Sequence, residues 1–287
     1  MYKVQKTAEL KLWIETVKKE GKQTIGFVPT MGALHEGHLS LIQQSRKNHD
    51  ITVVSIFVNP TQFNQQEDFL KYPRQNEKDI QLLEGTGCDL VFLPAVEDIY
   101  PTGEAPPPHY SLGEIETVLE GKYRPGHFQG VCQVVHRLLS LVEPDSLFLG
   151  EKDLQQCNVI ERLLHITGLY GKIKLIICDT LREKDGLAMS SRNLRLTPEQ
   201  RAVAPTIFKV LCQLNAGYGK TSYLQERAQA LTELREKGFE VDYLELVNRN
   251  TFEIQKDWNK EAPLFACIAA TIGNIRLIDN MRLDGIE

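Results

Sequence analysis

Residues 24–38 read Thr-Ile-Gly-Phe-Val-Pro-Thr-Met-Gly-Ala-Leu-His-Glu-Gly-His, and this stretch decides the fold. The short apolar run at 25–28 predicts a buried strand, and the apolar residues that begin at Leu39 predict a helix. The turn between them contains Gly32 and Gly37. A strand, a glycine-containing turn and a helix start present backbone N–H groups and a helix dipole to phosphate. We therefore expect an α/β fold with a phosphate-binding turn.

The same alternation continues through the first 180 residues. Apolar, β-branched and aromatic runs predict strands that are buried on both faces, at 51–58, 89–93, 146–149 and 174–178. Residues with helical spacing lie before and between these runs, at 8–20, 39–45, 76–84, 130–142 and 154–166. This order predicts a Rossmann-like, doubly wound parallel sheet, in which ligands bind beyond the carboxyl ends of the strands.

The pattern changes near Thr180, so we expect two domains, at 1–180 and 181–287. Thr197, Pro198 and Gln200 form the signature of a capping box, which predicts a helix running towards Leu214. A second helix is predicted at 222–237, and apolar runs predict strands at 241–246, 264–271 and 275–278. The second domain should therefore be a smaller α+β domain, and we expect it to act as a lid.

Composition and charge exclude several classes of protein. The chain has 287 residues with average apolar and charged content, which excludes a disordered tail protein or a coiled coil. The net charge is −5, and residues 1–180 carry 18 basic and 23 acidic side chains, so we expect no nucleic-acid partner. The cysteines form no C-x-x-C pair, which disfavours a redox motif. No run of 18 apolar residues occurs, so we expect no membrane partner. Since no signal segment is evident, we expect a cytoplasmic location.

Two histidines, His35 and His38, flank Glu36 and Gly37 at the predicted helix start. Imidazoles three residues apart share one side of a helical turn, and they can donate hydrogen bonds to phosphate or stabilise a leaving pyrophosphate. One alternative is a pair of surface histidines that cap the helix. Metal binding is disfavoured, because the motif is one residue short of H-E-x-x-H and no further ligand cluster is evident.

Polar residues also follow two other predicted strands. Asn59 and Gln62 come after the second strand, and the segment 150–156 comes after the fourth. The amides of Gln62 and Gln156 suit a hydroxyl or carboxylate, whereas Lys152 is a compact cation for phosphate. Asp153 could orient Lys152 or a magnesium-bound nucleotide. A solvated charged turn is the alternative interpretation of 150–156.

A third polar segment, 182–193, contains Ser190, Ser191 and Arg192. Two hydroxyls and a guanidinium suit a polyphosphate, and Gly186 suggests a mobile loop that closes over it. An interdomain linker is the alternative. His127 is a further candidate for a supporting contact.

Together these motifs resemble a known family. A His-x-Gly-His helix start with a downstream Met-Ser-x-Arg segment, here 35–38 and 189–192, is similar to the nucleotidylyltransferase superfamily. Four longer strings resemble the pantothenate synthetase (pantoate-β-alanine ligase) family in particular: VPTMGALHEGH at 28–38, SIFVNPTQF at 55–63, FLGEKDLQQ at 148–156 and DGLAMSSRN at 185–193. Four motifs in one order are more specific than any of them alone.

The resemblance implies a two-step reaction in the biosynthesis of pantothenate, a precursor of coenzyme A. The pantoate carboxylate attacks the α-phosphorus of magnesium ATP (Mg²⁺ with ATP), giving pantoyl adenylate and pyrophosphate. The β-alanine amine then attacks the acyl carbonyl and releases AMP and pantothenate. The resemblance also implies a homodimer.

It further implies roles for individual residues. His38 would be the proton donor, with His35, Lys152 and Arg192 as further catalytic groups. Pantoate would be held by Gln62 and Gln156, and Gln62 would also contact β-alanine. Asn59 would be a further substrate-binding residue. Tyr72 and Arg124 match other family positions. ATP would be held by Met31, Gly32, Ala33, Leu34, His35, Glu36, Gly37, His38, Gly150, Glu151, Lys152, Asp153, Leu181, Met189, Ser190, Ser191 and Arg192.

Two other functions share part of this signature. A nucleotidyltransferase that moves AMP or CMP onto a phosphorylated acceptor would share the histidine motif, but its product would keep the nucleotide. A catalytically idle regulator would bind ATP without turnover. A tRNA-charging enzyme is disfavoured by size and charge.

Overall fold

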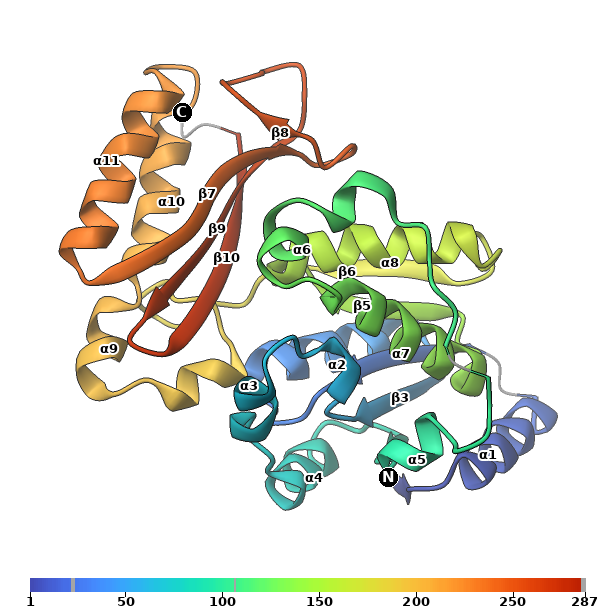
Figure 1. The fold of residues 1–287 in the computed structure, drawn as a ribbon. Helices are drawn as coiled ribbons and strands as arrows, with labels where there is room; N and C mark the ends of the chain where they lie inside the picture. Colours follow the sequence, from blue (N-terminus) through green and yellow to red (C-terminus); the bar gives the residue numbers. More distant parts are fainter. Residues whose placement is uncertain (22–23, 106, 285–287) are drawn as a thin grey trace. The chain divides into compact units, whose positions relative to one another are not determined.

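The computed structural model describes residues 1–21, 24–105 and 107–284 (Figure 1). The chain forms two compact units. Unit 1 comprises Met1–Glu151 and Gln156–Asp179, and unit 2 comprises Lys152–Gln155 and Thr180–Glu287.

Unit 1 contains a parallel sheet of six strands in the order β1-β4-β3-β2-β5-β6. The chain passes from β2 to β3 on one side, and β5 lies on the other side of β2. The carboxyl ends of β2 and β5 therefore flank the topological switch point, where open α/β sheets bind their ligands. The strands are β1 (Tyr2–Val4), β2 (Ile25–Thr30), β3 (Ile51–Ile56), β4 (Leu90–Phe92), β5 (Ser146–Gly150) and β6 (Lys174–Cys178).

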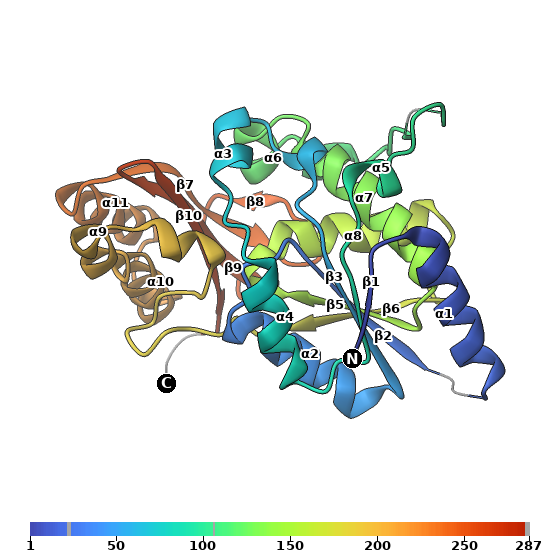
Figure 2. The same cartoon turned by 90° about the horizontal axis from the view of Figure 1, so that it is seen from below.

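Helices cover both faces of this sheet (Figures 1 and 2). The longer helices are α1 (Thr7–Lys19), α2 (Glu36–Asn48), α4 (Asn76–Glu84), α7 (His127–Val142) and α8 (Leu154–Ile166). The first two residues of α8 group with unit 2. Shorter helices connect them: η1 (Pro60–Gln62), α3 (Gln66–Lys71), α5 (Val96–Ile99), η2 (Gly113–Glu116), α6 (Leu119–Tyr123) and η3 (Glu151–Asp153).

Alternate residues of each central strand enter two different hydrophobic clusters. Phe27 and Val53 pack with the apolar faces of α1, α7 and α8, whereas Val28 and Val54 pack with α2 and α4. Strands buried on both faces explain why the sequence shows continuous apolar runs instead of alternating ones. The predicted doubly wound parallel sheet is confirmed.

Some boundaries differ from the predictions. The predicted helices at 76–84 and 154–166 match α4 and α8, but α2 and α7 begin three residues earlier than predicted, at Glu36 and His127. The strand β1 was not predicted, because three residues that pair only with β4 at the sheet edge leave no periodic signal.

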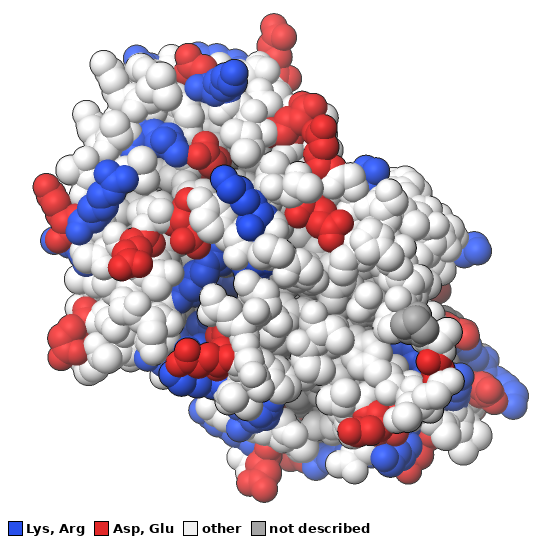
Figure 3. Space-filling model, in the orientation of Figure 1, with Lys and Arg blue, Asp and Glu red and all other residues white. Residues whose placement is uncertain are grey.

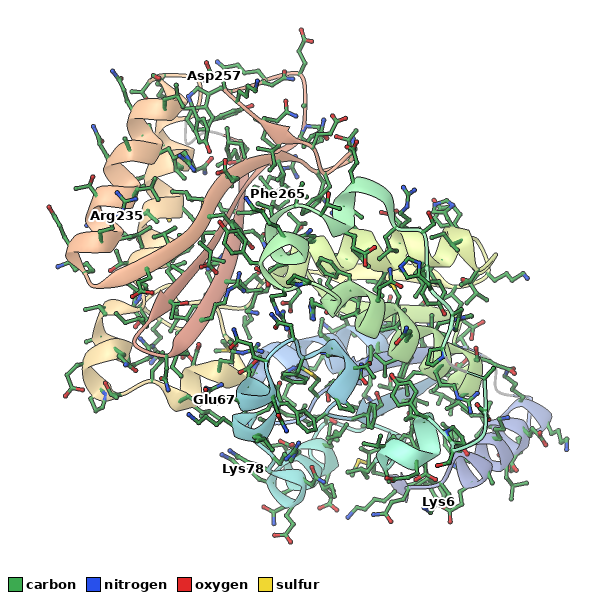
Figure 4. The ribbon with its side chains drawn as sticks, in the orientation of Figure 1. Lys6, Glu67, Lys78, Arg235, Asp257 and Phe265 are labelled. Atoms are coloured by element: carbon green, nitrogen blue, oxygen red, sulfur yellow. The ribbon has the colours of Figure 1, made fainter. Side chains whose placement is uncertain are left out.

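Unit 2 combines an antiparallel sheet with helices. Its strands follow the order β10-β9-β7-β8, and helix α10 packs against β9 and β10 while α11 packs against β7. The elements are η4 (Ser191–Arg195), α9 (Pro198–Val203), α10 (Thr206–Gly217), α11 (Tyr223–Glu236), β7 (Phe239–Asn248), β8 (Ile254–Gln255), β9 (Leu264–Ile272) and β10 (Ile275–Leu283). Phe265 of β9 is buried and Arg235 of α11 is exposed; both are labelled in Figure 4.

The capping box at the start of α9 forms as predicted. The N–H of Gln200 donates to the Thr197 hydroxyl, and the Thr197 N–H donates to the Gln200 side chain. The single helix predicted from there to Leu214 is wrong, because the chain forms α9 and α10 with a break at Pro205. Proline cannot donate the backbone hydrogen bond that a continuous helix needs at this position.

None of the helices among the described residues is long and apolar enough to cross a bilayer. On the face seen in Figure 3, basic and acidic side chains are interspersed. Several charged side chains form ion pairs, as Lys6 (labelled in Figure 4) does with Asp98 at 3.2 Å.

Candidate active site

A buried carboxylate, that of Asp79, accepts hydrogen bonds from the turn between β2 and α2. The N–H groups of Ala33 and Leu34 each donate to a different oxygen of Asp79, both at 2.8 Å, and Asp79 is only 1% exposed. Gly32 and Ala33 have φ values of +82° and +49°, which turn the chain so that both N–H groups face α4. These two donors therefore serve Asp79, and the turn has a fixed shape before any ligand binds.

Asp79 was not among the residues predicted from the sequence. It lies one helical turn before the buried Leu83 on α4, so it occupies the core-facing side of that helix. A carboxylate at such a position needs hydrogen-bond partners. An aspartate on the apolar side of the predicted helix was therefore the signal in the sequence that could have identified Asp79.

The two histidines begin α2. His35 is the N-cap residue and His38 is the third helical residue, and their ring centroids lie 4.1 Å apart. The N–H of His35 donates to Nδ1 of His38 at 3.3 Å. Because Nδ1 accepts this bond, the proton of the neutral His38 ring lies on Nε2. His38 is thereby oriented as a hydrogen-bond donor beyond the carboxyl end of β2.

Asn59, at the start of η1, is buried and makes several side-chain hydrogen bonds. Its Oδ1 accepts hydrogen bonds from the hydroxyls of Thr61 and Tyr100, each at 3.0 Å. Its Nδ2 donates to the Gly130 carbonyl at 3.1 Å and to Oε1 of Gln62 at 3.2 Å. Both amide protons of Asn59 are therefore committed within the protein, and its side chain is 1% exposed.

Gln62 is held in one amide orientation. Since Asn59 donates to its Oε1, the Gln62 amide nitrogen faces the other way, where Nε2 lies 2.9 Å from Sδ of Met31. This contact links η1 to the end of β2, so the structure brings Met31 and Gln62 together. Tyr72 is buried, and its ring makes a T-shaped contact with the ring of Phe63, the residue after Gln62.

Gly130 permits the close approach of α7 to η1. A Cβ atom at this position would lie 2.3 Å from the backbone oxygen of Thr61. We therefore expect Gly130→Ala to separate α7 from η1 and to destabilise the fold by about 1–3 kcal/mol. Differential scanning calorimetry should show a lower melting temperature. Gly85→Ala is the matched control, because its Cβ would meet nothing closer than 3.7 Å; equal melting temperatures for the two variants would contradict the prediction.

The segment after β5 spans both units. Gly150 ends β5 and Glu151 begins η3 in unit 1, whereas Lys152 and Asp153 group with unit 2. The Lys152 carbonyl accepts a hydrogen bond from Nδ2 of Asn280 at 2.9 Å, and its Nζ lies 3.4 Å from Oδ1 of Asp153. Gln156 is half-buried in the first turn of α8 and groups with unit 1.

In unit 2, residues 181–189 form a hairpin-like turn. The Met189 N–H donates to the Leu181 carbonyl at 3.0 Å, and Arg182 makes a two-pronged ion pair with the buried Asp279, at 2.6 and 3.0 Å. At Gly186, φ is +91° and a Cβ would lie 2.1 Å from the Phe208 ring. The loop predicted at Gly186 is thus attached to the body of unit 2 at several points.

The predicted phosphate-binding residues that follow this turn begin η4. Ser190 is the N-cap residue, and its hydroxyl accepts a hydrogen bond from the Arg192 N–H at 3.3 Å. Ser191 is 6% exposed, and the Arg192 side chain is half-buried. The cap fixes the backbone from which Arg192 projects.

The sequence-predicted residues therefore fall into two groups. Unit 1 holds the residues at 31–38, Asn59, Gln62, Gly150, Glu151 and Gln156, with Asp79 and His127 as supporting residues. Unit 2 holds Lys152, Asp153, Leu181 and the residues at 189–192.

Two buried cysteines of unit 1 are poorly suited to nucleophilic chemistry. Burial raises the pKa of Cys88 and of Cys132 to about 12, so these thiols stay protonated and are poor nucleophiles. Across the described part of the chain, no group of three or more His, Cys, Asp or Glu side chains is arranged to hold a metal ion.

Comparisons with known proteins agree with this architecture. The family model described as Pantoate-beta-alanine ligase matches residues 2–282. Pantothenate synthetase of Porphyromonas gingivalis is 43% identical over 283 residues, covering 96% of this chain and 97% of the relative. The enzyme of the same name from Caldicellulosiruptor bescii is 43% identical over 285 residues, covering 98% of each chain.

Solved structures give the same result. The crystal structure of pantothenate synthetase from Thermus thermophilus superposes with a TM-score of 0.90 at 39% identity, covering 99% of each chain. A pantoate-beta-alanine ligase from Francisella tularensis, described as complexed with Beta-gamma ATP and Beta-alanine, gives a TM-score of 0.82 at 37% identity. It covers 98% of this chain and 97% of that one. The match over nearly the whole chain shows that this protein belongs to the Pantoate-beta-alanine ligase family of enzymes.

Proposed function

We propose that this enzyme condenses pantoate with β-alanine at the expense of ATP, giving pantothenate, AMP and pyrophosphate. In the first step a pantoate carboxylate oxygen bonds to the α-phosphorus of ATP while the bond to pyrophosphate breaks, which forms pantoyl adenylate. In the second step the β-alanine amine attacks the acyl carbonyl, loses a proton and displaces AMP. The observation that carries this proposal is the fixed pair His35 and His38 beside the switch point of a family member.

In this proposal ATP is held by the residues that the sequence resemblance implies. In unit 1 these are the segment 31–38 with Gly150 and Glu151, and in unit 2 they are Lys152, Asp153, the backbone of Leu181 and the segment 189–192. Within 31–38 the N–H groups of Ala33 and Leu34 donate to Asp79. These two N–H groups are therefore not available to phosphate, whereas the histidine side chains offer donors.

Magnesium enters as part of the magnesium–ATP substrate. Mg²⁺ in nucleotide sites usually binds through the substrate phosphates and one or two carboxylates. Asp153 is the candidate carboxylate, because it follows β5 and its side chain is 44% exposed.

The side chains act by positioning and by charge stabilisation. His38 presents Nε2–H to the phosphate oxygens, where negative charge grows as pyrophosphate leaves. Lys152 and Arg192 add positive charge to the same phosphates. Since the substrate carboxylate and amine are themselves the nucleophiles, the protein must mainly align them and exclude water from the reactive acyl phosphate.

Gln62 and Gln156 hold pantoate, and Gln62 also contacts β-alanine in this proposal. The sequence placed Asn59 beside them as a substrate contact. Its buried side chain and its two internal amide bonds support a different role, in which Asn59 acts on substrate through the orientation of Gln62. The homodimer, the cytoplasmic location and the lid role of residues 181–287 stay predictions.

Product analysis tests the reaction. The protein is incubated with magnesium ATP and pantoate, with and without β-alanine, and the products are identified by mass spectrometry. We expect pantothenate and AMP in equal amounts only when β-alanine is present. ADP and phosphate in either incubation, or an end product that keeps the nucleotide when β-alanine is present, would contradict the proposal.

Replacement of Arg192 tests the contribution of unit 2. We expect Arg192→Ala to lower the rate of pyrophosphate release by about 10²-fold, because a group that stabilises transition-state charge is lost. The fold should be unchanged, since the cap of η4 uses the Arg192 backbone N–H and not its guanidinium. Arg235→Ala on α11, which is exposed, is the matched control. A wild-type rate and ATP affinity for Arg192→Ala would exclude its role at the phosphates.

A further inference from the structure

A chain of hydrogen bonds lies behind Gln62 and ends on its backbone carbonyl. Nδ1 of His127 lies 2.7 Å from this carbonyl oxygen. Nη1 of Arg124 lies 3.1 Å from Nε2 of the same ring and 3.4 Å from Oε2 of Glu120, and Nη2 lies 3.5 Å from the Gln62 carbonyl. Glu120 lies in α6, Arg124 is the residue that follows α6, and His127 is the first residue of α7.

The partners decide the protonation of His127. A carbonyl oxygen can only accept a hydrogen bond, so Nδ1 must donate. A guanidinium can only donate, so Nε2 must accept. His127 is therefore a neutral imidazole with its proton on Nδ1, and Arg124 stabilises this tautomer over the other one.

Burial makes the arrangement rigid. Glu120 and His127 are each 6% exposed, and the Arg124 side chain is 16% exposed. Charged groups at this depth are stable only when they are paired and hydrogen-bonded, so Arg124 and Glu120 keep a defined geometry. These bonds hold the backbone carbonyl of Gln62. The Gln62 side chain is held separately, by its contacts with Asn59 and Met31.

We propose that His127, held in one tautomer by Arg124 and Glu120, is a positioning residue that fixes Gln62 for pantoate. This inference rests on the proposed function, in which Gln62 binds that substrate. None of the hydrogen bonds that join Glu120, Arg124 and His127 involves His35 or His38. Their loss should therefore weaken the use of pantoate and leave the affinity for ATP unchanged.

Two variants of similar shape separate hydrogen bonding from packing. His127→Asn keeps an N–H donor near the position of Nδ1, whereas His127→Leu has the same branching without a donor. We expect His127→Leu to lower kcat/KM for pantoate by about 10- to 10²-fold, because a displaced contact residue costs alignment. His127→Asn should stay within about threefold of wild type, and ATP affinity from calorimetry should change by less than about twofold in both.

A double-mutant cycle with Gln62→Ala then distinguishes positioning from a general structural role. If His127 acts through the Gln62 side chain, adding His127→Leu to Gln62→Ala should cause no further loss of kcat/KM for pantoate. Multiplied losses, or an equal loss for His127→Asn and His127→Leu, would overturn the inference. If His127→Leu fails to fold, Arg124→Met combined with Glu120→Leu supplies the same test, because the pair of changes removes the donor to Nε2, leaves the ring in place and leaves no buried carboxylate unpaired.

The same assay separates this inference from the proposed function. A wild-type protein that makes no pantothenate would overturn the function and the inference together. A wild-type protein that is active, with a Gln62→Ala variant of equal activity, would leave the function standing and overturn the inference.

Discussion

His38→Ala should lower the pantoate-dependent release of pyrophosphate by about 10²-fold or more, because it removes a hydrogen-bond donor that acts on charge formed in the transition state. The variant also loses the Nδ1 atom that accepts the His35 N–H, so the position of the neighbouring ring becomes less defined. We expect the effect mainly in kcat, since the donor contributes more to the transition state than to the ground state. Rapid-quench measurement of the first turnover isolates this step.

Two further variants control this result. His38→Gln keeps an amide donor near the position of Nε2 and should recover part of the lost rate. His109→Ala removes an exposed histidine from a loop of the same unit and should behave as wild type. A wild-type first turnover in His38→Ala would refute the role of His38, although it would leave the fold assignment intact.

Asp79→Asn should be the most destabilising isosteric change in the candidate site. The amide keeps one acceptor for the Ala33 and Leu34 N–H groups but turns an NH₂ group towards the other, so one buried donor loses its partner. The variant loses one hydrogen bond to a charged group and gains an unsatisfied buried donor. Together these should lower its free energy of unfolding by about 3 kcal/mol. The released turn precedes His35 directly, so the first-turnover rate should fall as well.

Asp50→Asn is the matched control for Asp79→Asn. Asp50 accepts hydrogen bonds from the N–H and the hydroxyl of Thr24, but it is exposed. Water can therefore accept any hydrogen bond that the asparagine amide group no longer accepts. Calorimetry should therefore show a much larger fall in melting temperature for Asp79→Asn. Equal melting temperatures for both variants, with an unchanged first turnover, would mean that Asp79 does not hold the turn.

The architecture of unit 1 was predictable because strands buried on both faces leave strong apolar runs. Phe27 and Val28 are adjacent in sequence and enter opposite cores, and the polar residues that follow β2, β3 and β5 mark the carboxyl ends of those strands. Local chemistry also predicted the start of α9, where Thr197 and Gln200 cap the helix reciprocally.

Asp79 and the contact partner of His127 could not be predicted, because they depend on contacts between distant segments. Asp79 meets Ala33 across 46 residues, and His127 meets Gln62 across 65. The sequence offers a carboxylate on an apolar helix face and a histidine near a helix start, but it does not say which turn each one reaches. The commitment of both Asn59 amide protons is likewise visible only when the Gly130 carbonyl is in place.

The transfer of an oxygen atom tests the central proposal most directly. Pantoate labelled with ¹⁸O in its carboxylate is converted with unlabelled magnesium ATP and β-alanine, and the AMP is examined by mass spectrometry. If the carboxylate attacks the α-phosphorus, one ¹⁸O must appear in AMP and none in pyrophosphate. Unlabelled AMP, or ¹⁸O in phosphate released with ADP, would contradict the pantoyl adenylate and with it the roles proposed for His38, Lys152 and Arg192.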